Sequence, residues 1–113
     1  MPDQALALEI TPLEVQRRME AGERLRLIDV REPAEFQLAR IEGAELIPMA
    51  DIPGALAALE GDQRPLVVLC HHGVRSYRVV CWLREQGLTA CQSMAGGIER
   101  WSAEVDPKVP TYS

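Results

Sequence analysis

The chain has 113 residues, of which 47% are hydrophobic, 26% charged and 4% aromatic. This composition is typical of one compact globular domain with a single core. The formal charge of -5 at pH 7 disfavours a general surface for nucleic acid or anionic membrane, although a local basic site can still bind a small anion. We therefore expect one domain over residues 1–113 and neither a nucleic-acid nor a membrane partner.

The amino-terminal segment and the cysteines predict a cytoplasmic protein. Residues 1–10 carry Asp3 and Glu9 and lack the cationic start and apolar core of a signal peptide. No apolar run approaches the length of a membrane span. The three cysteines, Cys70, Cys81 and Cys91, leave one unpaired in any disulfide scheme, and a reducing compartment argues against a structural bridge. At least one thiol is therefore expected to be free.

The first half of the chain alternates between helical and strand patterns. Thr11 and Pro12 are typical of a helix start, at which Thr11 caps the N3 amide and Glu14 completes a capping box, and Gly22 ends this helix. Residues 25–30 then predict a strand, and residues 33–36 begin a short helix. A second short strand is expected over 43–48 and a second helix over 52–59.

The second half continues this alternation. The unbroken apolar run at 66–70 predicts a central parallel strand that is covered on both faces. A helix is expected over 76–86, with Val79, Val80 and Leu83 on one apolar stripe, followed by a strand over 91–94 and a closing helix after Gly97. This regular alternation predicts an open α/β sheet. In such sheets ligands bind beyond the carboxyl ends of the strands.

Cys70 is the strongest candidate for a functional residue because it ends the central strand. The residues that follow it are His71, His72, Gly73, Val74, Arg75 and Ser76. Amides of this loop and of the helix start favour the thiolate form of a cysteine. Gly73 permits a tight backbone in which N–H groups converge. Arg75 adds a cation that can bind an oxyanion through two parallel hydrogen bonds, and Ser76 is expected to cap the helix.

The other two cysteines and the two histidines have simpler interpretations. A free cysteine is usually a small buried hydrophobe, which is the interpretation for Cys81; Cys91 lies near a strand start, where a role as a resolving thiol has little support. His71 and His72 are expected to face solvent, or alternatively to tune the thiolate or donate a proton. Adjacent histidines beside one cysteine lack the spacing of a zinc site. We therefore expect no metal and no cofactor.

Several blocks of the sequence resemble, in order, those of the single-domain rhodanese-like sulfurtransferases. The blocks are residues 10–12, 27–36, 41–48, 70–76 and 95–101, with the sequences ITP, LIDVREPAEF, IEGAELIP, CHHGVRS and AGGIERW. The resemblance implies a three-layer α/β fold with a mostly parallel five-stranded sheet and helices on both faces. It also implies that Cys70 is catalytic and carries sulfane sulfur as a persulfide, and that the substrate-binding loop consists of His71, His72, Gly73, Val74, Arg75 and Ser76.

The chemistry that this resemblance implies is a ping-pong cycle. The thiolate attacks the outer sulfur of thiosulfate or a related persulfide donor and later passes that sulfur to cyanide or a thiol. Amides from His71 to Arg75 would stabilise the persulfide, and Arg75 would orient the anionic donor. Two alternatives stay open, which are a protein-to-protein sulfur relay and a non-catalytic regulatory module. Related domains of the second kind often lack the cysteine.

Two further comparisons with the family refine the interpretation. Relatives that act as phosphatases or arsenate reductases carry one more residue between cysteine and arginine, whereas four residues separate Cys70 from Arg75 here, so those activities are less favoured. Asp29, Arg31 and Glu35 repeat the family's acidic–basic pattern, and we expect them to form a structural ion-pair cluster. Asp29 and Arg31 are also candidates to support the loop from behind.

Overall fold

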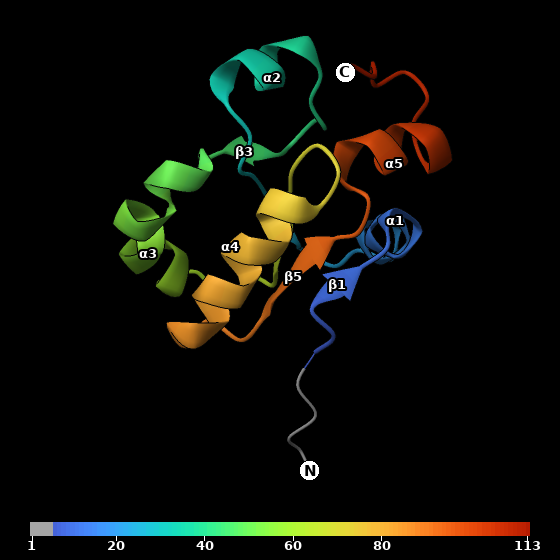
Figure 1. Ribbon diagram of the computed structural model, residues 1–113. Helices are drawn as coiled ribbons and strands as arrows, with labels where there is room; N and C mark the ends of the chain where they lie inside the picture. The colour runs from blue at the N-terminus through green and yellow to red at the C-terminus, as the bar shows by residue number, and fades with distance from the viewer. Residues whose placement is uncertain (1–5) are drawn as a thin grey trace.

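The structure, a computed structural model, describes residues 6–113 and contains a five-stranded sheet between helices (Figure 1). Asp3, used above, lies outside the described residues. Every strand pairs in parallel with its neighbours, in the order β1-β5-β4-β2-β3. The strands are β1 (Glu9–Ile10), β2 (Arg26–Asp29), β3 (Glu45–Leu46), β4 (Leu66–Leu69) and β5 (Cys91–Met94). The expected α/β fold is confirmed, with the apolar strand β4 at the centre.

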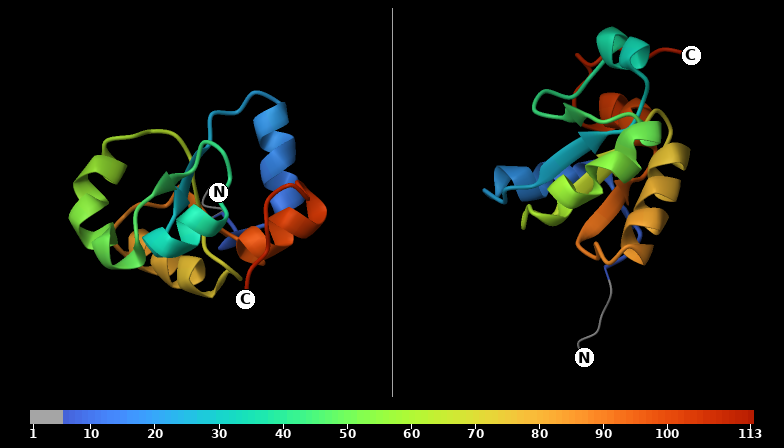
Figure 2. Two further views of the ribbon diagram at one scale, coloured as in Figure 1. Left: turned by 90° about the horizontal axis from the view of Figure 1, so that it is seen from above. Right: turned by 90° about the vertical axis from the view of Figure 1, so that its left-hand side faces the viewer.

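Helices cover both faces of this sheet, as the two views of Figure 2 show. The helices are α1 (Pro12–Glu20), α2 (Pro33–Leu38), α3 (Ile52–Glu60), α4 (Val74–Glu85) and α5 (Gly97–Glu104), and a 3-10 turn η1 (Met49–Asp51) precedes α3. Side chains of α1 and α5 share one apolar core, and those of α3 and α4 share the other. Within residues 6–113, none of the helices combines the length and apolarity that crossing a bilayer requires.

Strand β4 contributes to both cores, which explains why its sequence is apolar without interruption. Val67 and Leu69 point into the core beneath α1 and α5, whereas Val68 and Cys70 belong to the core beneath α3 and α4. Successive side chains of a strand point to opposite faces, so a strand covered twice needs apolar residues at every position. This alternation directs the Cys70 side chain toward the face on which α4 begins.

The start of α4 differs from the sequence prediction. The helix begins at Val74, with Gly73 at its N-cap in a left-handed conformation of φ 98°. The prediction that Ser76 caps this helix is therefore wrong, because Ser76 already lies in the first turn and is buried. The physical reason is that a glycine at positive φ turns the chain into the helix without needing a side-chain cap.

The start of α1 follows the prediction in part. The Glu14 amide donates a 3.1 Å hydrogen bond to Thr11 Oγ1, so Thr11 is the N-cap. The Glu14 carboxylate instead accepts a hydrogen bond from Arg17 Nη1 at 2.7 Å. The capping box is thus only half formed, because a nearby guanidinium offers the carboxylate a charged donor.

Candidate active site

The sulfur of Cys70 accepts backbone hydrogen bonds at the carboxyl end of the central strand. The Gly73 amide donates to Cys70 Sγ at 3.1 Å, and the Ser76 amide donates at 3.3 Å. One donor is in the loop and the other is in the first turn of α4. Amide donors and the positive end of a helix stabilise negative charge on sulfur. Cys70 is only 1% exposed, so its sulfur is closely surrounded by the loop of residues 70–76, which we call the cradle.

Two serines extend the hydrogen bonding behind the sulfur. Ser76 Oγ lies 3.4 Å from Cys70 Sγ and 2.7 Å from Ser93 Oγ. Ser93 is fully buried on β5, where it pairs in register with Val68 of the central strand. When Cys70 is a thiolate, the Ser76 hydroxyl is free to donate to sulfur while it accepts a hydrogen bond from Ser93. The pair therefore gives the sulfur a third donor.

The start of α5 packs directly against the backbone of the cysteine loop. The Ile98 amide donates to the Cys70 carbonyl at 2.8 Å, and the Glu99 amide donates to the His71 carbonyl at 3.2 Å. A Cβ at Gly97 would overlap both of these carbonyl oxygens, and Gly97 has a positive φ of 62°. Only glycine meets both requirements. The loop is therefore held by two sets of hydrogen bonds. The amides of α5 donate to its carbonyl groups, and its own amides donate to the Cys70 sulfur.

We expect Gly97→Ala to lower the free energy of unfolding by more than about 1 kcal/mol, because backbone must move to make room for the methyl group. Urea denaturation measures the change. Gly54→Ala is the matched control, since Gly54 lies within α3 with nothing near its Cβ position, and the new alanine should be neutral or stabilise by up to about 1 kcal/mol. A Gly97→Ala midpoint equal to the wild-type value would contradict the close approach of α5 to the loop.

Arg75 makes a two-pronged ion pair with Glu35 of α2. Its Nη1 and Nη2 donate to Glu35 Oε1 and Oε2 at 2.8 and 2.9 Å. The two parallel hydrogen bonds expected for a donor's oxyanion are thus made to a carboxylate of the protein itself. Hydrogen bonds from Arg75 hold the pKa of the Glu35 carboxyl well below its usual range, and the same pairing raises the pKa of Arg75. Arg75 therefore acts as a fixed cation beside the loop.

The Glu35 ion pair predicts an acid-labile contribution to stability. A carboxyl whose folded pKa lies below its unfolded value stabilises the fold above the unfolded pKa, and this contribution is lost as pH falls toward the folded pKa. The free energy of unfolding should therefore decrease as pH falls below about 4.5, and Glu35→Gln should flatten this slope. Urea denaturation at a series of pH values measures it. Glu42→Gln, at an exposed glutamate, is the control, and an identical slope in Glu35→Gln and wild type would contradict the pairing.

Asp29 and Arg31 form a fully buried ion pair, as the sequence pattern predicts. Arg31 Nη2 lies 2.7 Å from Asp29 Oδ2, and both side chains are 0% exposed. Arg31 also donates to the Ala39 carbonyl at 2.6 Å and to the Tyr112 hydroxyl at 2.9 Å. The carboxylate of Glu35 pairs with Arg75 instead of joining this cluster. Asp29 and Arg31 therefore brace the carboxyl end of β2, and Arg31 reaches the site through Tyr112.

The two histidines of the loop lie in different environments. His72 is exposed, but the His71 side chain is only 11% exposed and its ring stacks between His72 and Tyr112, with ring centroids 3.8 and 3.9 Å apart. The expectation that both face solvent is therefore wrong for His71. His71 Nε2 also lies 3.3 Å from Glu99 Oε1. The physical reason is that the carboxy-terminal segment returns over the loop and covers one ring.

His71, His72 and Glu99 bring three potential metal ligands within 4.8 Å of one another. The two imidazole planes are stacked at 26°, so their in-plane nitrogen lone pairs run nearly side by side. A tetrahedral metal needs lone pairs that converge on one point. These residues would have to unstack before they could hold a metal ion.

The other two cysteines lie away from the cradle. Cys81 is partly buried on α4, and Cys91 is buried at the start of β5. The Cys91 thiol donates to the Leu88 carbonyl at 3.2 Å, and burial raises the pKa of this thiol. A raised pKa keeps a thiol protonated and poorly nucleophilic. This environment gives no support to a resolving-thiol role for Cys91. Cys81, expected in the core, is only partly buried, so that expectation holds only in part.

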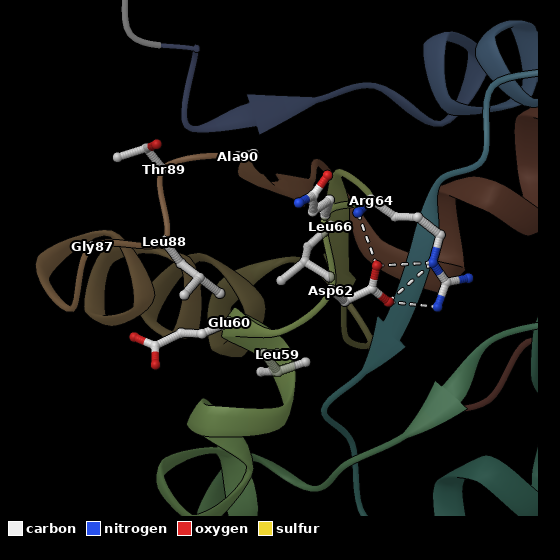
Figure 3. Close-up of a pocket in the computed structure, with 10 residues that line it drawn as sticks. Leu59, Glu60, Asp62, Arg64, Leu66, Gly87, Leu88, Thr89 and Ala90 are labelled. Carbon is white, nitrogen blue, oxygen red and sulfur yellow. Dashed lines mark hydrogen bonds and ion pairs between the residues drawn. The ribbon is translucent and has the colours of Figure 1, made fainter.

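Figure 3 shows a cavity of the structure, which has a volume of about 470 Å³. It lies beside the amino-terminal end of β4, and its lining includes Leu66, Leu88 and the Asp62–Arg64 ion pair. Ligands of parallel sheets bind at the carboxyl edge of the strands. The cysteine loop follows the carboxyl end of β4 and therefore lies at that edge, whereas this cavity does not.

Sequence reasoning missed Ser93, Glu99 and Tyr112 as parts of the site. Ser93 meets Ser76 because β5 is the parallel neighbour of β4. Glu99 and Tyr112 approach the loop through α5 and the segment after it. No local pattern marks these residues, because their contacts are made between segments far apart in the chain.

The fold and the loop define a class of α/β domain in which backbone amides donate to one cysteine sulfur at the carboxyl edge of a parallel sheet. A family model described as "Rhodanese-like domain" matches residues 11–104. The chain belongs to this family, in agreement with the resemblance of its sequence blocks.

Named relatives and solved structures agree with this assignment. The chain is 38% identical over 109 residues to the maize "Adenylyltransferase and sulfurtransferase MOCS3-1", covering 91% of this chain but 23% of that protein. It is 35% identical over 83 residues to "Thiosulfate sulfurtransferase GlpE" of Pseudoalteromonas translucida, covering 74% and 78%. A rhodanese-related protein from Thermoplasma volcanium superposes with a TM-score of 0.78 at 28% identity, covering 94% of this chain and 100% of that one.

Proposed function

We propose that this protein is a sulfurtransferase that carries sulfane sulfur on Cys70. The observation that supports the proposal best is the pair of amide hydrogen bonds from Gly73 and Ser76 to Cys70 Sγ. A persulfide carries its negative charge on sulfur, and fixed amide donors stabilise such charge without reorganising. Thiosulfate is the proposed donor, since a similar protein bears that substrate in its name. The acceptor is cyanide or a thiol.

The proposed cycle has two displacement steps that need no external oxidant. The Cys70 thiolate attacks the outer sulfur of thiosulfate, a new S–S bond forms, and the S–S bond of thiosulfate breaks with its electron pair leaving on sulfite. The cysteine then carries one extra sulfur with a negative charge. Cyanide or a thiolate attacks this outer sulfur, the persulfide S–S bond breaks, and the Cys70 thiolate returns. This is covalent catalysis by a ping-pong route.

In this cycle Arg75 supplies the positive charge that attracts and orients the anionic donor, although its two-pronged edge is bound to Glu35. Both prongs bind Glu35, yet the Arg75 side chain is 31% exposed and its guanidinium retains N–H groups that are not used in this pair. The thiolate charge of Cys70 is a smaller contributor, after Glu35, to the raised pKa of Arg75, so the two groups attract one another. Arg75 thus places positive charge near the sulfur, where it attracts and orients the anionic donor.

The test compares thiosulfate, glutathione persulfide, arsenate and an aryl phosphate as substrates of the full chain. We expect intact-mass measurement to show one added sulfur after thiosulfate, removed by cyanide with release of thiocyanate, and no turnover of arsenate or phosphate. Four residues between Cys70 and Arg75 leave a smaller loop than the phosphatase type. A mass that never changes with either sulfur donor would overturn the transferase proposal in favour of a non-catalytic regulatory module.

A second candidate is a relay in which Cys70 exchanges sulfur with another protein. Apolar side chains at the start of α4 favour it: Val74 and Tyr77, which lie one helical turn apart, are 62% and 38% exposed. Exposed apolar residues that gather at one place are typical of interaction sites. A relay predicts that a protein bearing a persulfide loads Cys70 faster than thiosulfate does, and that Tyr77→Ser slows only the protein donor. Cys70, Cys81 and Cys91 are free thiols, which favours a reducing compartment. We therefore propose that the protein is located in the cytoplasm.

A further inference from the structure

Tyr112, next to the last residue of the chain, lies against the candidate active site. Figure 1 shows the carboxy-terminal segment returning from α5 toward α2, near the loop between β4 and α4. The Tyr112 ring stacks on His71 at 3.9 Å with an interplanar angle of 10°. Its hydroxyl donates to Glu35 Oε2 at 2.7 Å and accepts a hydrogen bond from Arg31 Nη1 at 2.9 Å. One side chain therefore touches the loop, α2 and the end of β2.

Through Glu35, these contacts reach Arg75. Glu35 Oε2 accepts hydrogen bonds from both Tyr112 and Arg75, and Glu35 Oε1 accepts from Arg75 and from the Glu32 amide. The carboxylate is therefore oriented by three groups. Without the Tyr112 hydroxyl, the carboxylate would lose one of its anchors and Arg75 would be held less firmly beside Cys70.

The ring of Tyr112 acts on the other half of the loop. His71 and His72 stack on one another, and His71 immediately follows the cysteine. With Tyr112 on its second face, the His71 ring is enclosed on both sides. Stacking of this kind stabilises aromatic pairs beyond the effect of their buried area and therefore favours one orientation of the His71 ring. Tyr112 thus restrains the first residue of the loop that surrounds the sulfur.

We propose that Tyr112 is a positioning residue for sulfur transfer, whose ring orients His71 and whose hydroxyl holds the Glu35 carboxylate on Arg75. The proposal rests on the sulfurtransferase function proposed above. It assigns the carboxy-terminal segment to the wall of the active site. Tyr112 itself acts only through His71, Glu35 and Arg31.

Two substitutions distinguish the effect of the Tyr112 ring from the effect of its hydroxyl. Tyr112→Phe keeps the ring and removes the hydroxyl, and we expect the rate of persulfide formation with thiosulfate to fall about three- to tenfold, as the loss of one or two hydrogen bonds predicts. Tyr112→Ala removes both contacts and should lower this rate at least about tenfold. Intact-mass measurement at timed intervals follows the reaction. Alkylation of Cys70 by iodoacetamide, a neutral reagent that needs no donor orientation, should not slow in either variant.

Imidazole NMR signals report directly on the stack. The chain has two histidines, so a His72→Gln sample assigns both sets of signals. Tyr112→Ala should move the His71 ring signals downfield because the tyrosine ring no longer shields them, whereas Tyr112→Phe should leave them in place. Thr111→Ala, at an exposed neighbour in the same segment, is the matched control and should retain the wild-type rate and spectrum.

The outcomes distinguish this proposal from the function on which it rests. Wild-type protein that takes up no sulfur overturns the sulfurtransferase proposal. Wild-type uptake combined with unchanged rates in both Tyr112 variants overturns the role of Tyr112 alone. Parallel losses in thermal stability, alkylation and persulfide formation would show a merely structural contact and would also overturn it. Slower persulfide formation with unslowed alkylation supports positioning.

Discussion

Cys70→Ser is expected to abolish persulfide formation and to lower thiosulfate-to-cyanide transfer at least about 10³-fold, because no other group replaces a lost covalent nucleophile. Intact-mass measurement after thiosulfate treatment should show no added sulfur, and colorimetric thiocyanate measurement should give the background rate. A hydroxyl is not ionised at neutral pH as a thiolate is, and it is a weak nucleophile without an adjacent base. The serine oxygen can still accept hydrogen bonds from Gly73 and Ser76, so the loop should remain folded.

Cys81→Ser is the matched control for this experiment. Cys81 is a free cysteine on the same helix that follows the loop, but it is partly buried away from the cradle. The control variant should take up one sulfur at the wild-type rate. Sulfur uptake by Cys70→Ser together with its loss in Cys81→Ser would contradict the assignment of Cys70 and move the nucleophile to the helix.

Arg31→Ala is expected to lower the free energy of unfolding by about 3–5 kcal/mol, the usual cost of removing one partner from a buried ion pair. Both Asp29 and Arg31 are 0% exposed, so the Asp29 carboxyl group would be left without its partner and away from water. The Ala39 carbonyl and the Tyr112 hydroxyl would also lose a donor. This change is a large fraction of the stability of a small domain. Urea denaturation followed by tryptophan fluorescence measures it.

The double variant Asp29→Leu/Arg31→Met separates the unpaired charge from the lost contacts. Replacing both members of a buried pair with apolar residues is often far less costly than removing one. We therefore expect the double variant to recover much of the stability lost in Arg31→Ala. Arg17→Ala, at an exposed ion pair on α1, should change stability by less than about 1 kcal/mol. Equal losses in Arg31→Ala and Arg17→Ala would contradict the importance of burial.

Local sequence patterns predicted some elements of the structure correctly and missed others. The uninterrupted apolar run of β4 predicted a central strand, because a strand covered on both faces has no polar position. The motif from Cys70 to Ser76 predicted a loop that surrounds an anion, because glycine and a helix start bring amides together. The short turn η1 was not predicted, since three residues are too few to show a helical period. The beginning of α4 was misplaced because Gly73 replaces a side-chain cap by its backbone conformation.

The partners of the functional side chains depended on contacts that the sequence does not encode locally. Arg75 was expected to face a donor, but α2 brings Glu35 to it, 40 positions away in the chain. His71 was expected in solvent, but Tyr112 covers it from the end of the chain. A charged or aromatic side chain takes the partner that burial and geometry offer it, and that partner is set by how the elements pack.

The sequence alone therefore determined the class of fold, the place of Cys70 in the sheet and the kind of loop that holds it. These features follow from local periodicity and from backbone conformations that particular residues permit. The tertiary structure alone decided that Glu35 holds Arg75, that Ser93 extends the hydrogen bonding behind the sulfur and that Tyr112 lies on the loop. The reason is that a parallel sheet brings the carboxyl ends of distant strands, and the helices after them, to one edge.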